Sequence, residues 1–256
     1  MSTKTSIASN LRERLRAAIL SGEYPPASRL RLEQLGENYG VSLSPLREAL
    51  LRLTGEGLVV SEDQRGFAVA DVSAANLAEV TSLRALLEPY ALRLAIEHGT
   101  LQWEERLAGV YHRLTRAEEQ VERVPESAGV TGVTGASGAT GMTGPTEPVG
   151  RDATLLQTWE PVHRDFHFAL LEGCGMPMLL AFCGNLYDRA DRYRRLHLEQ
   201  RPPQPEVRRE HRAILDAALA RDAARASAAL REHIERSSRV IQAFLREREA
   251  LPAALS

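Results

Sequence analysis

The sequence predicts a mainly α-helical protein with a small helix-and-hairpin segment at its N-terminus. Hydrophobic residues make up 43% of the 256 residues, enough to build a core, whereas aromatic residues make up only 5%. The later part of the chain is rich in Ala, Leu, Arg and Glu, a composition that favours helix and excludes an all-β fold. Only near the N-terminus do short apolar runs indicate strands.

Charge and cysteine usage restrict the function classes. The formal net charge of −2 gives no global basic field, so any nucleic-acid surface must be local. Residues 1–10 are polar without an apolar segment, and no later stretch of about 18 apolar residues without charge occurs, so we expect neither secretion nor a membrane span. Cys174 and Cys183 lie nine residues apart, a spacing that indicates neither a disulfide framework nor a thiolate zinc site. We therefore expect a protein of the reducing cytoplasm.

Two helices are predicted before residue 41. The first begins at Asn10, because Glu13 three residues later completes an N-cap pattern, and it stops before Gly22. The second follows the break at residues 24–26 and ends at Gly40. Both end at a glycine, the residue that most easily adopts the left-handed conformation of a helix C-cap.

A third helix and a hairpin complete the N-terminal segment. The helix opens at Ser42 or Ser44, carries Pro45 in its first turn, where the missing N–H costs little, and ends at Gly55 or Gly57. Apolar runs at 58–60 and 67–69 flank the polar stretch 61–66 and predict a β-hairpin. Three helices followed by a hairpin is the order of a winged helix-turn-helix, which we assign to residues 1–72.

Helical periodicity dominates the remaining chain, which we assign to one all-helical domain at residues 73–250. Two helices are expected between residues 73 and 124, the first kinked at Pro89. Further helices are expected at 152–171, 178–197, 206–219 and 222–245. Before the helix expected at 152–171, glycine recurs at every third position of residues 129–146; six triplets are too few for a collagen triple helix, so we expect a disordered insertion at 125–150.

The start of the third helix is the candidate DNA-reading segment. In a helix-turn-helix protein the second helix of the motif enters the major groove, and its first side chains reach base edges. Those positions are Ser42, Leu43, Ser44, Pro45 and Arg47. The alternative is that the serines only cap the helix and that Arg47 is a solvated charge.

Residues 10–72 resemble the N-terminal domain of the GntR family of bacterial transcription factors. The resemblance rests on "VSLSPLREAL" at 41–50 and on the Arg-Gly pair at the hairpin tip. It implies that the first side chains of the recognition helix contact operator DNA in the major groove and that the hairpin tip contacts the minor groove. Many members carry Arg where this chain has Leu43. The resemblance implies contacts by Ser42, Ser44, Arg47, Arg65 and Gly66, and our predicted DNA-binding set adds Arg31, Leu43, Pro45 and Arg52.

Four histidines in the C-terminal region form a candidate metal site. His163 and His167 are four apart in "VHRDFH", so both imidazoles project from one face of a helix. His211 and His233 lie on two later predicted helices. A pair on one helix completed by single residues from others is how a helical bundle builds a metal site. The alternative is that the four are surface or core residues without a metal.

Residues 76–245 resemble the helical effector domain of the FCD branch of the GntR family. In that branch an Asp and three His bind a divalent metal, usually zinc or nickel, which often helps to hold a small carboxylate effector. His167, His211 and His233 match the three histidines, and His163 stands at the aspartate position. This departure implies either a site of four nitrogens or a pocket that works without metal.

An arginine of the first effector-domain helix is a candidate effector ligand. Arg84 matches an arginine that faces the pocket in this branch, and a planar guanidinium suits bidentate capture of a carboxylate. Its alternative is an ion pair with Glu88 on the helix surface. Further candidates come from "NLYDRADRYRRL", where a structural role for the tyrosines is equally open: Tyr187, Arg192, Tyr193 and Arg194.

The combined interpretation is a ligand-responsive transcriptional regulator that binds a short palindromic operator as a homodimer. The effector is expected to be a small organic acid, with dicarboxylates suggested by the resemblance, and the protein is expected on the nucleoid when bound to DNA. Two alternatives remain: a metal-dependent enzyme that uses the histidine cluster, and a helical scaffold whose DNA-binding domain has lost its function.

Overall fold

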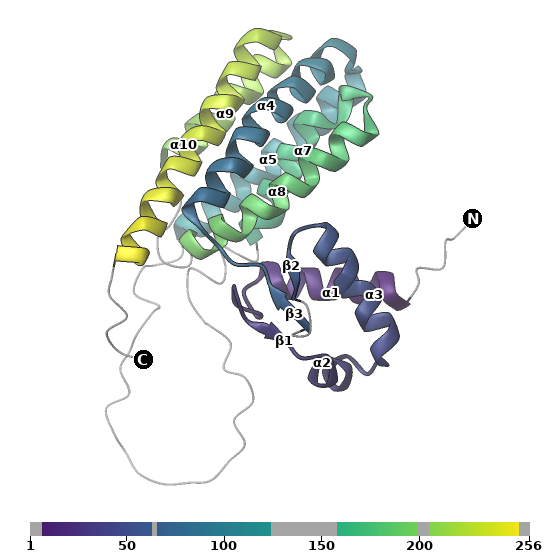
Figure 1. The fold of residues 1–256 in the computed structure, drawn as a ribbon. Coiled ribbons are helices and arrows are strands. Elements are labelled where there is room, and N and C mark those ends of the chain that lie inside the picture. The colour runs from purple at the N-terminus through teal and green to yellow at the C-terminus, as the bar shows by residue number, and fades with distance from the viewer. Residues whose placement is uncertain (1–6, 63–65, 124–157, 199–204, 251–256) are drawn as a thin grey trace, which may run out of the picture. The chain divides into compact units, whose positions relative to one another are not determined.

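The computed structural model describes residues 7–62, 66–123, 158–198 and 205–250 (Figure 1). The chain groups into two compact units, one formed by residues 1–88, 177–197 and 231–256 and the other by residues 89–176 and 198–230. None of the described helices is long and apolar enough to cross a membrane. The glycine triplets of the expected insertion at 125–150 lie outside the described residues.

The N-terminal part of the first unit has the predicted order of helices and hairpin and is a winged helix-turn-helix (Figure 1). Its sheet is antiparallel with the strand order β1-β3-β2, in which Leu30 pairs with Phe67 and Val60 pairs with Ala68. The elements are α1 (Ile7–Leu20), β1 (Arg29–Leu30), α2 (Leu32–Tyr39), α3 (Leu43–Gly55), β2 (Val59–Glu62) and β3 (Gly66–Val69).

One hydrophobic core holds these elements together. Leu11 and Leu15 of α1 and Leu46 and Leu50 of α3 are almost completely buried, and each pair is spaced four residues apart, so it lies on one face of its helix. Phe67 of β3 closes the core from the sheet. Burying side chains of this size contributes about 1.5–3 kcal/mol each, and the core thereby fixes the orientation of α3.

The boundaries of α2 and α3 confirm the sequence prediction, whereas the start of α1 does not. Gly40 caps α2 in the left-handed region at φ 64°, and Ser42 precedes α3 in an extended conformation. Asn10 was expected to cap the first helix, but it lies inside α1, which already includes Ile7. Buried Ala8 extends the apolar stripe by one turn, and this packing carries the helix past the predicted cap.

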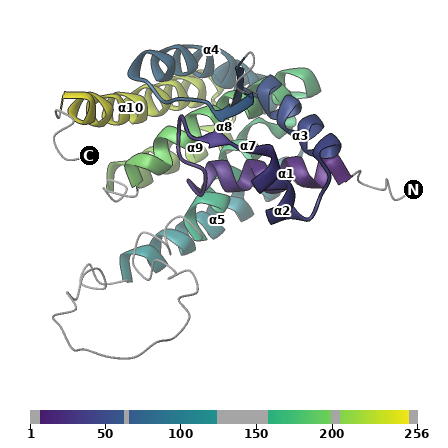
Figure 2. The same cartoon turned by 60° about the horizontal axis from the view of Figure 1, so that its bottom comes forward.

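The rest of the first unit is mainly helical as far as the structure describes it. It contains the first part of α4 (Ala74–His98), most of α8 (Pro177–Leu198) and the later part of α10 (Ala223–Ala250). Leu77, Tyr193 and Phe244, one from each helix, form its core. The α4 and α10 helices lie side by side in both views (Figures 1 and 2), and the hydroxyls of Thr81 and Ser238 approach to 2.6 Å.

The second unit combines the rest of α4 with α5 (Leu101–Arg123), α7 (Glu160–Leu171), the short 3-10 helix η3 (Glu172–Cys174), α9 (Pro205–Leu219) and the first turns of α10. Trp103 Nε1 donates a buried hydrogen bond of 2.8 Å to the carbonyl of Ala169, which joins α5 to α7. Pro89, the position of the predicted kink, lies inside α4, which continues through it. Ser227 Oγ donates to the Pro89 carbonyl at 3.0 Å.

Candidate functional site

The first turn of α3 presents polar and apolar side chains to solvent. Ser42, Leu43, Ser44 and Arg47 are exposed and Pro45 is half-buried. The exposed fraction of Leu43 is 44%, high for an apolar residue. The opposite face of α3 packs in the core, so this surface is held rigidly and suits docking into a DNA groove.

The remaining predicted DNA contacts lie around this helix. Arg31 is exposed immediately before α2. Arg52 is exposed too; its Nη2 pairs with Glu48 at 2.6 Å and its Nη1 donates to Ser9 at 3.2 Å. Gly66 begins β3 with φ 86°, a conformation that favours glycine. Arg65 lies outside the described residues.

The four predicted histidines come together. His163 and His167 project from α7, His211 from α9 and His233 from α10, and each offers one ligand atom within 4.8 Å of the others. All four are buried, and His211 is completely inaccessible. The α7 pair follows from the spacing of four residues, and burial of Phe166 and Leu170 on the same helix turns that face inward.

The donor set fits a divalent transition metal. His163 Nε2 lies 3.2 Å from His167 Nε2. Two nitrogens bound to one tetrahedral zinc ion, each at about 2.0–2.1 Å, are separated by about 3.3 Å, close to the observed distance. The ring of Trp159 stacks on His163 with centroids 4.2 Å apart and fixes its orientation.

Burial and neighbouring arginines favour the neutral, metal-binding form of His233. Burial lowers the pKa of His233 to about 3; the charges of Arg84 and Arg194 also lower it, while Glu88 opposes them. The carboxylate of Glu118 lies 3.8 Å from His211 Nδ1, and Arg208 Nε donates to the same carboxylate at 2.9 Å. A carboxylate beside a ligating histidine typically orients the ring.

The ion pair of Arg84 with Glu88 is present, but it is buried instead of lying on the helix surface. Arg84 Nε and Nη2 contact the two Glu88 oxygens at 2.5 and 3.2 Å, and the Glu88 side chain is only 2% exposed. The guanidinium carbons of Arg84 and Arg194 lie 5.1 and 5.2 Å from the Tyr187 ring centre, and Arg194 Nη1 donates to the Tyr187 hydroxyl at 3.1 Å. Tyr187 thereby joins two cations in one cluster.

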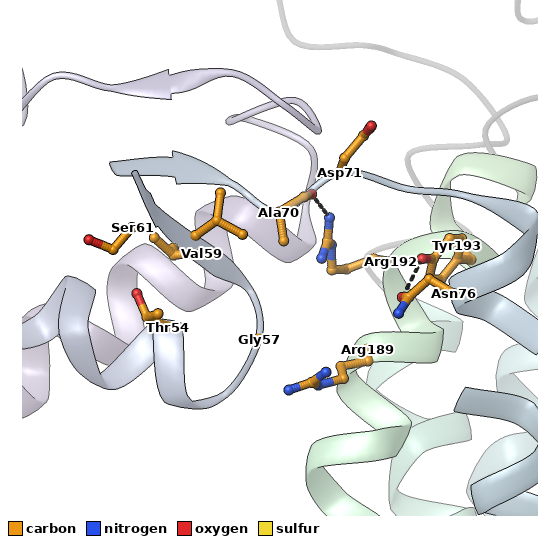
Figure 3. A pocket seen from close by; sticks show the side chains of 11 residues that line it. Thr54, Gly57, Val59, Ser61, Ala70, Asp71, Asn76, Arg189, Arg192 and Tyr193 are labelled. Atoms are coloured by element: carbon orange, nitrogen blue, oxygen red, sulfur yellow. Dashed lines mark hydrogen bonds between the residues drawn. The ribbon is translucent and has the colours of Figure 1, made fainter. Parts of the chain in front are cut away.

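The structure places Arg192 and Tyr193 elsewhere. They line a pocket together with Thr54, Gly57 and other residues of the first unit (Figure 3), and neither Arg84 nor Tyr187 lines it. Five residues separate Tyr187 from Arg192, which is about 140° around a helix, so the two side chains leave α8 in different directions. Helical geometry alone could have separated them.

Three further residues were missed by the sequence interpretation. Glu118 has no motif around it, and only the packing of α5 against α9 brings it to His211. Arg189 could have been found, since it lies three residues before Arg192 on the same face of α8. Asp191, which pairs with Arg194 and Arg195, stands at the spacings typical of helical ion pairs.

Comparisons with known proteins identify the family. Residues 7–69 match the description "Bacterial regulatory proteins, gntR family" and residues 150–236 match "FCD domain". The HTH-type transcriptional regulator BphR of Paraburkholderia xenovorans (strain LB400) is 36% identical over 232 residues, which cover 91% of this chain and 84% of BphR. The chain belongs to the GntR family. Another GntR-type relative, the HTH-type transcriptional repressor GlaR of Escherichia coli (strain K12), is 31% identical over 89% of this chain and 92% of its own.

Solved structures share the GntR-family fold. E. coli McbR/YncC superposes with a TM-score of 0.70 over 93% of this chain and 98% of its own, at 23% identity. The protein is therefore a bacterial DNA-binding transcriptional regulator with an FCD effector-binding domain, and not an enzyme. This excludes the metal-dependent enzyme that the sequence left as an alternative.

Proposed function

We propose that this regulator works as a homodimer whose affinity for operator DNA is controlled by a small organic acid, a divalent metal, or both, bound in the helical C-terminal domain. The observation that carries the proposal is the meeting of four buried imidazoles from three helices. Burial disfavours the charged form of an imidazole, and the neutral imidazole is the form that binds a metal.

Zinc or nickel is the expected metal, because imidazole nitrogen is a preferred ligand of both. His163, His167, His211 and His233 would hold it. A bound ion would supply a Lewis acid that attracts a carboxylate oxygen. Four histidines complete the coordination of a tetrahedral zinc ion, whereas an ion of higher coordination number keeps a position for the acid. The preferred metal therefore decides whether the site is structural or takes part in effector binding.

Arg84 is the expected partner of an effector carboxylate. Its planar guanidinium already makes two contacts with the Glu88 carboxylate, so the geometry for bidentate binding exists. An incoming acid would compete with Glu88 for this group. Tyr187 and Arg194 would line the same site, because the guanidinium groups of Arg84 and Arg194 both lie against the Tyr187 ring. Short dicarboxylates are the first class of acid to test.

Operator contacts are assigned to the exposed start of α3 and to the hairpin. Ser42, Leu43, Ser44 and Arg47 would read the major groove, and Arg31, Pro45 and Arg52 would flank them. Arg65 and Gly66 would reach the minor groove. Two copies related by a twofold axis would recognise a short palindrome. We expect the regulator to repress, as the name of its relative GlaR states for that protein.

The mechanism we propose is a population shift. The effector or metal binds one arrangement of the paired DNA-binding domains more tightly than another, and DNA affinity changes by that difference. The test is a mobility shift on the promoter region of the regulator's own gene, with protein purified without chelator or histidine tag. Zinc, nickel or an organic acid should change the affinity about 5- to 150-fold, the usual range of allosteric coupling.

Two results would contradict this proposal separately. Operator binding that no metal or acid alters would exclude ligand control. A lack of specific binding to the promoter region would instead favour a helical scaffold without DNA-binding function.

A further inference from the structure

A pocket of about 550 Å³ lies in the first unit, apart from the histidine cluster (Figure 3). Its walls come from the end of α3, from β2, from the start of α4 and from α8. Among the residues that line the pocket, these have polar or charged side chains that could contact a ligand: Thr54, Ser61, Asn76, Arg189, Arg192 and Tyr193. None of the four histidines lines this pocket.

Two of the four arginines on the later part of α8 face this pocket, and their partners differ from those of the other two. Arg194 and Arg195 pair with Asp191. Within the described ranges, Arg189 and Arg192 form no ion pair with a carboxylate. Arg189 Nε donates to the Glu56 carbonyl and to Asn185 Oδ1, both at 3.0 Å, and Arg192 Nη2 donates to the Ala70 carbonyl. Backbone carbonyls and an amide carry only partial charges, so they compensate the two cations only in part.

Burial makes this lack of compensation costly for Arg192. The residue is only 6% exposed. Burial lowers the pKa of the Arg192 guanidinium and the charge of Arg189 acts in the same direction, while Tyr193 and Asp71 oppose them. Asp71 is exposed to solvent, and its carboxylate points away from the Arg192 guanidinium in Figure 3. A buried cation with so little compensation favours an anionic ligand.

The backbone around the pocket accommodates Arg189. Gly57 has φ 72°, a conformation that favours glycine, and a Cβ atom added there would collide with the Arg189 guanidinium. The turn between α3 and β2 is therefore shaped to receive this cation. Asn76 Oδ1 accepts a hydrogen bond of 2.7 Å from the Tyr193 hydroxyl, which fixes the amide and leaves its nitrogen as a donor.

We propose that this pocket binds a small oxyanion with two negative charges, of the size of inorganic phosphate, between Arg189 and Arg192. Planar guanidinium groups bind such oxygens in pairs, and the Asn76 amide nitrogen supplies a further donor. The site is a second ligand site of the regulator, independent of the histidine cluster.

The test is thermal unfolding of the full-length protein with inorganic phosphate, compared with sodium chloride of equal ionic strength. A ligand in tenfold excess over its dissociation constant should raise the midpoint by about 3 to 6 °C in a chain of this size. Arg189→Gln and Arg192→Gln should each remove most of this shift. Arg189→Gln should disturb folding less than Arg192→Gln, because Arg189 is half-buried whereas Arg192 is buried.

Matched variants separate this pocket from other anion sites. Arg93→Gln removes an exposed arginine of α4, and Arg47→Gln removes one from the DNA-reading surface; both should keep the full shift. His167→Ala should keep it as well, because His167 does not line the pocket. The proposal is overturned if phosphate does not stabilise the wild type, or if the shift survives in both Arg189→Gln and Arg192→Gln. A shift lost only in His167→Ala would also overturn it.

Discussion

His163 Nε2 and His167 Nε2 lie 3.2 Å apart on consecutive turns of α7, with the ligand atoms of His211 and His233 within 4.8 Å of both. Two imidazole nitrogens at this distance either share a proton or bind one ion. Four nitrogens gathered in this way from three helices make the ion the stronger expectation.

Removal of one ligand should empty the site. Protein purified without chelator should carry about one divalent metal per chain, and His167→Ala and His211→Ala should each lose most of it in elemental analysis. Chelation should lower the unfolding midpoint of the wild type, because an ion bound only by the folded state stabilises that state. Operator binding without effector should stay intact in both variants, since the DNA-binding domain holds none of the ligands.

The matched control is His112→Ala, which removes an exposed histidine of α5 and should keep the metal. If the wild type contains no metal and neither zinc nor nickel raises its unfolding midpoint, the metal site is excluded. An organic-acid pocket around Arg84 would then remain.

Replacement of His163 by aspartate should preserve the site. A carboxylate ligand adds a negative charge to a set of four neutral nitrogens, so His163→Asp should hold the metal at least as tightly as the wild type, as measured by competition with a chelator. His163→Leu, which has similar volume but no ligand atom, should weaken it strongly. Equal metal affinity in the leucine variant would remove His163 from the ligand set.

Acid should destabilise the metal-free protein through His233. Its pKa is about 3 in the folded chain, below the ordinary value of 6.5, so the unfolded chain binds more protons between these values. Stability from this group is therefore complete above pH 6.5 and falls as the pH decreases toward 3. In chelated protein, the unfolding free energy should drop between pH 7 and pH 5, and His233→Gln should show a smaller drop. An equal drop in both proteins would contradict this assignment.

Local sequence patterns predicted most helices but not the contacts between distant segments. Gly40 and Ser42 mark the turn between α2 and α3 because each has a strong backbone preference of its own. The strand β1 was missed, because two residues are too few to show alternation and they pair only with distant β3. Ala8 extends α1 through tertiary packing, which no cap pattern reports.

For the candidate site too, the sequence predicted local placement but not the contacts between distant helices. Spacing placed His163 and His167 on one face, but nothing in the spacing required α9 and α10 to bring His211 and His233 to the same point. The sequence left Arg84 open between a pocket and an ion pair with Glu88. The ion pair forms and is buried, because the helix face that carries it turns inward. Arg192 was grouped with Tyr187 by closeness in sequence, although helical geometry separates them.

Loss of Arg47 should weaken operator binding. Its side chain is exposed in the first turns of α3, so Arg47→Ala should cost about 1–3 kcal/mol if the guanidinium reads a base. If it contacts phosphate instead, the salt dependence of binding should decrease by about one unit of slope. Arg113→Ala, an exposed arginine of α5, is the control and should bind normally. Unchanged affinity and unchanged salt slope for Arg47→Ala would remove it from the interface.

Leu43 should determine one position of the operator. It is 44% exposed at the first position of α3, and an apolar side chain there suits contact with a thymine methyl group, whereas arginine would pair with guanine. Leu43→Arg should therefore shift the preferred base toward guanine at one position of each half-site, with a discrimination of about 1–3 kcal/mol, as read by selection from a randomised DNA library. Leu51→Arg adds the same charge at another exposed leucine of α3 and should raise affinity without changing the selected sequence, because a charge away from the base edges acts only on phosphate. A selected sequence that is the same for Leu43→Arg and the wild type would show that residue 43 does not face the bases.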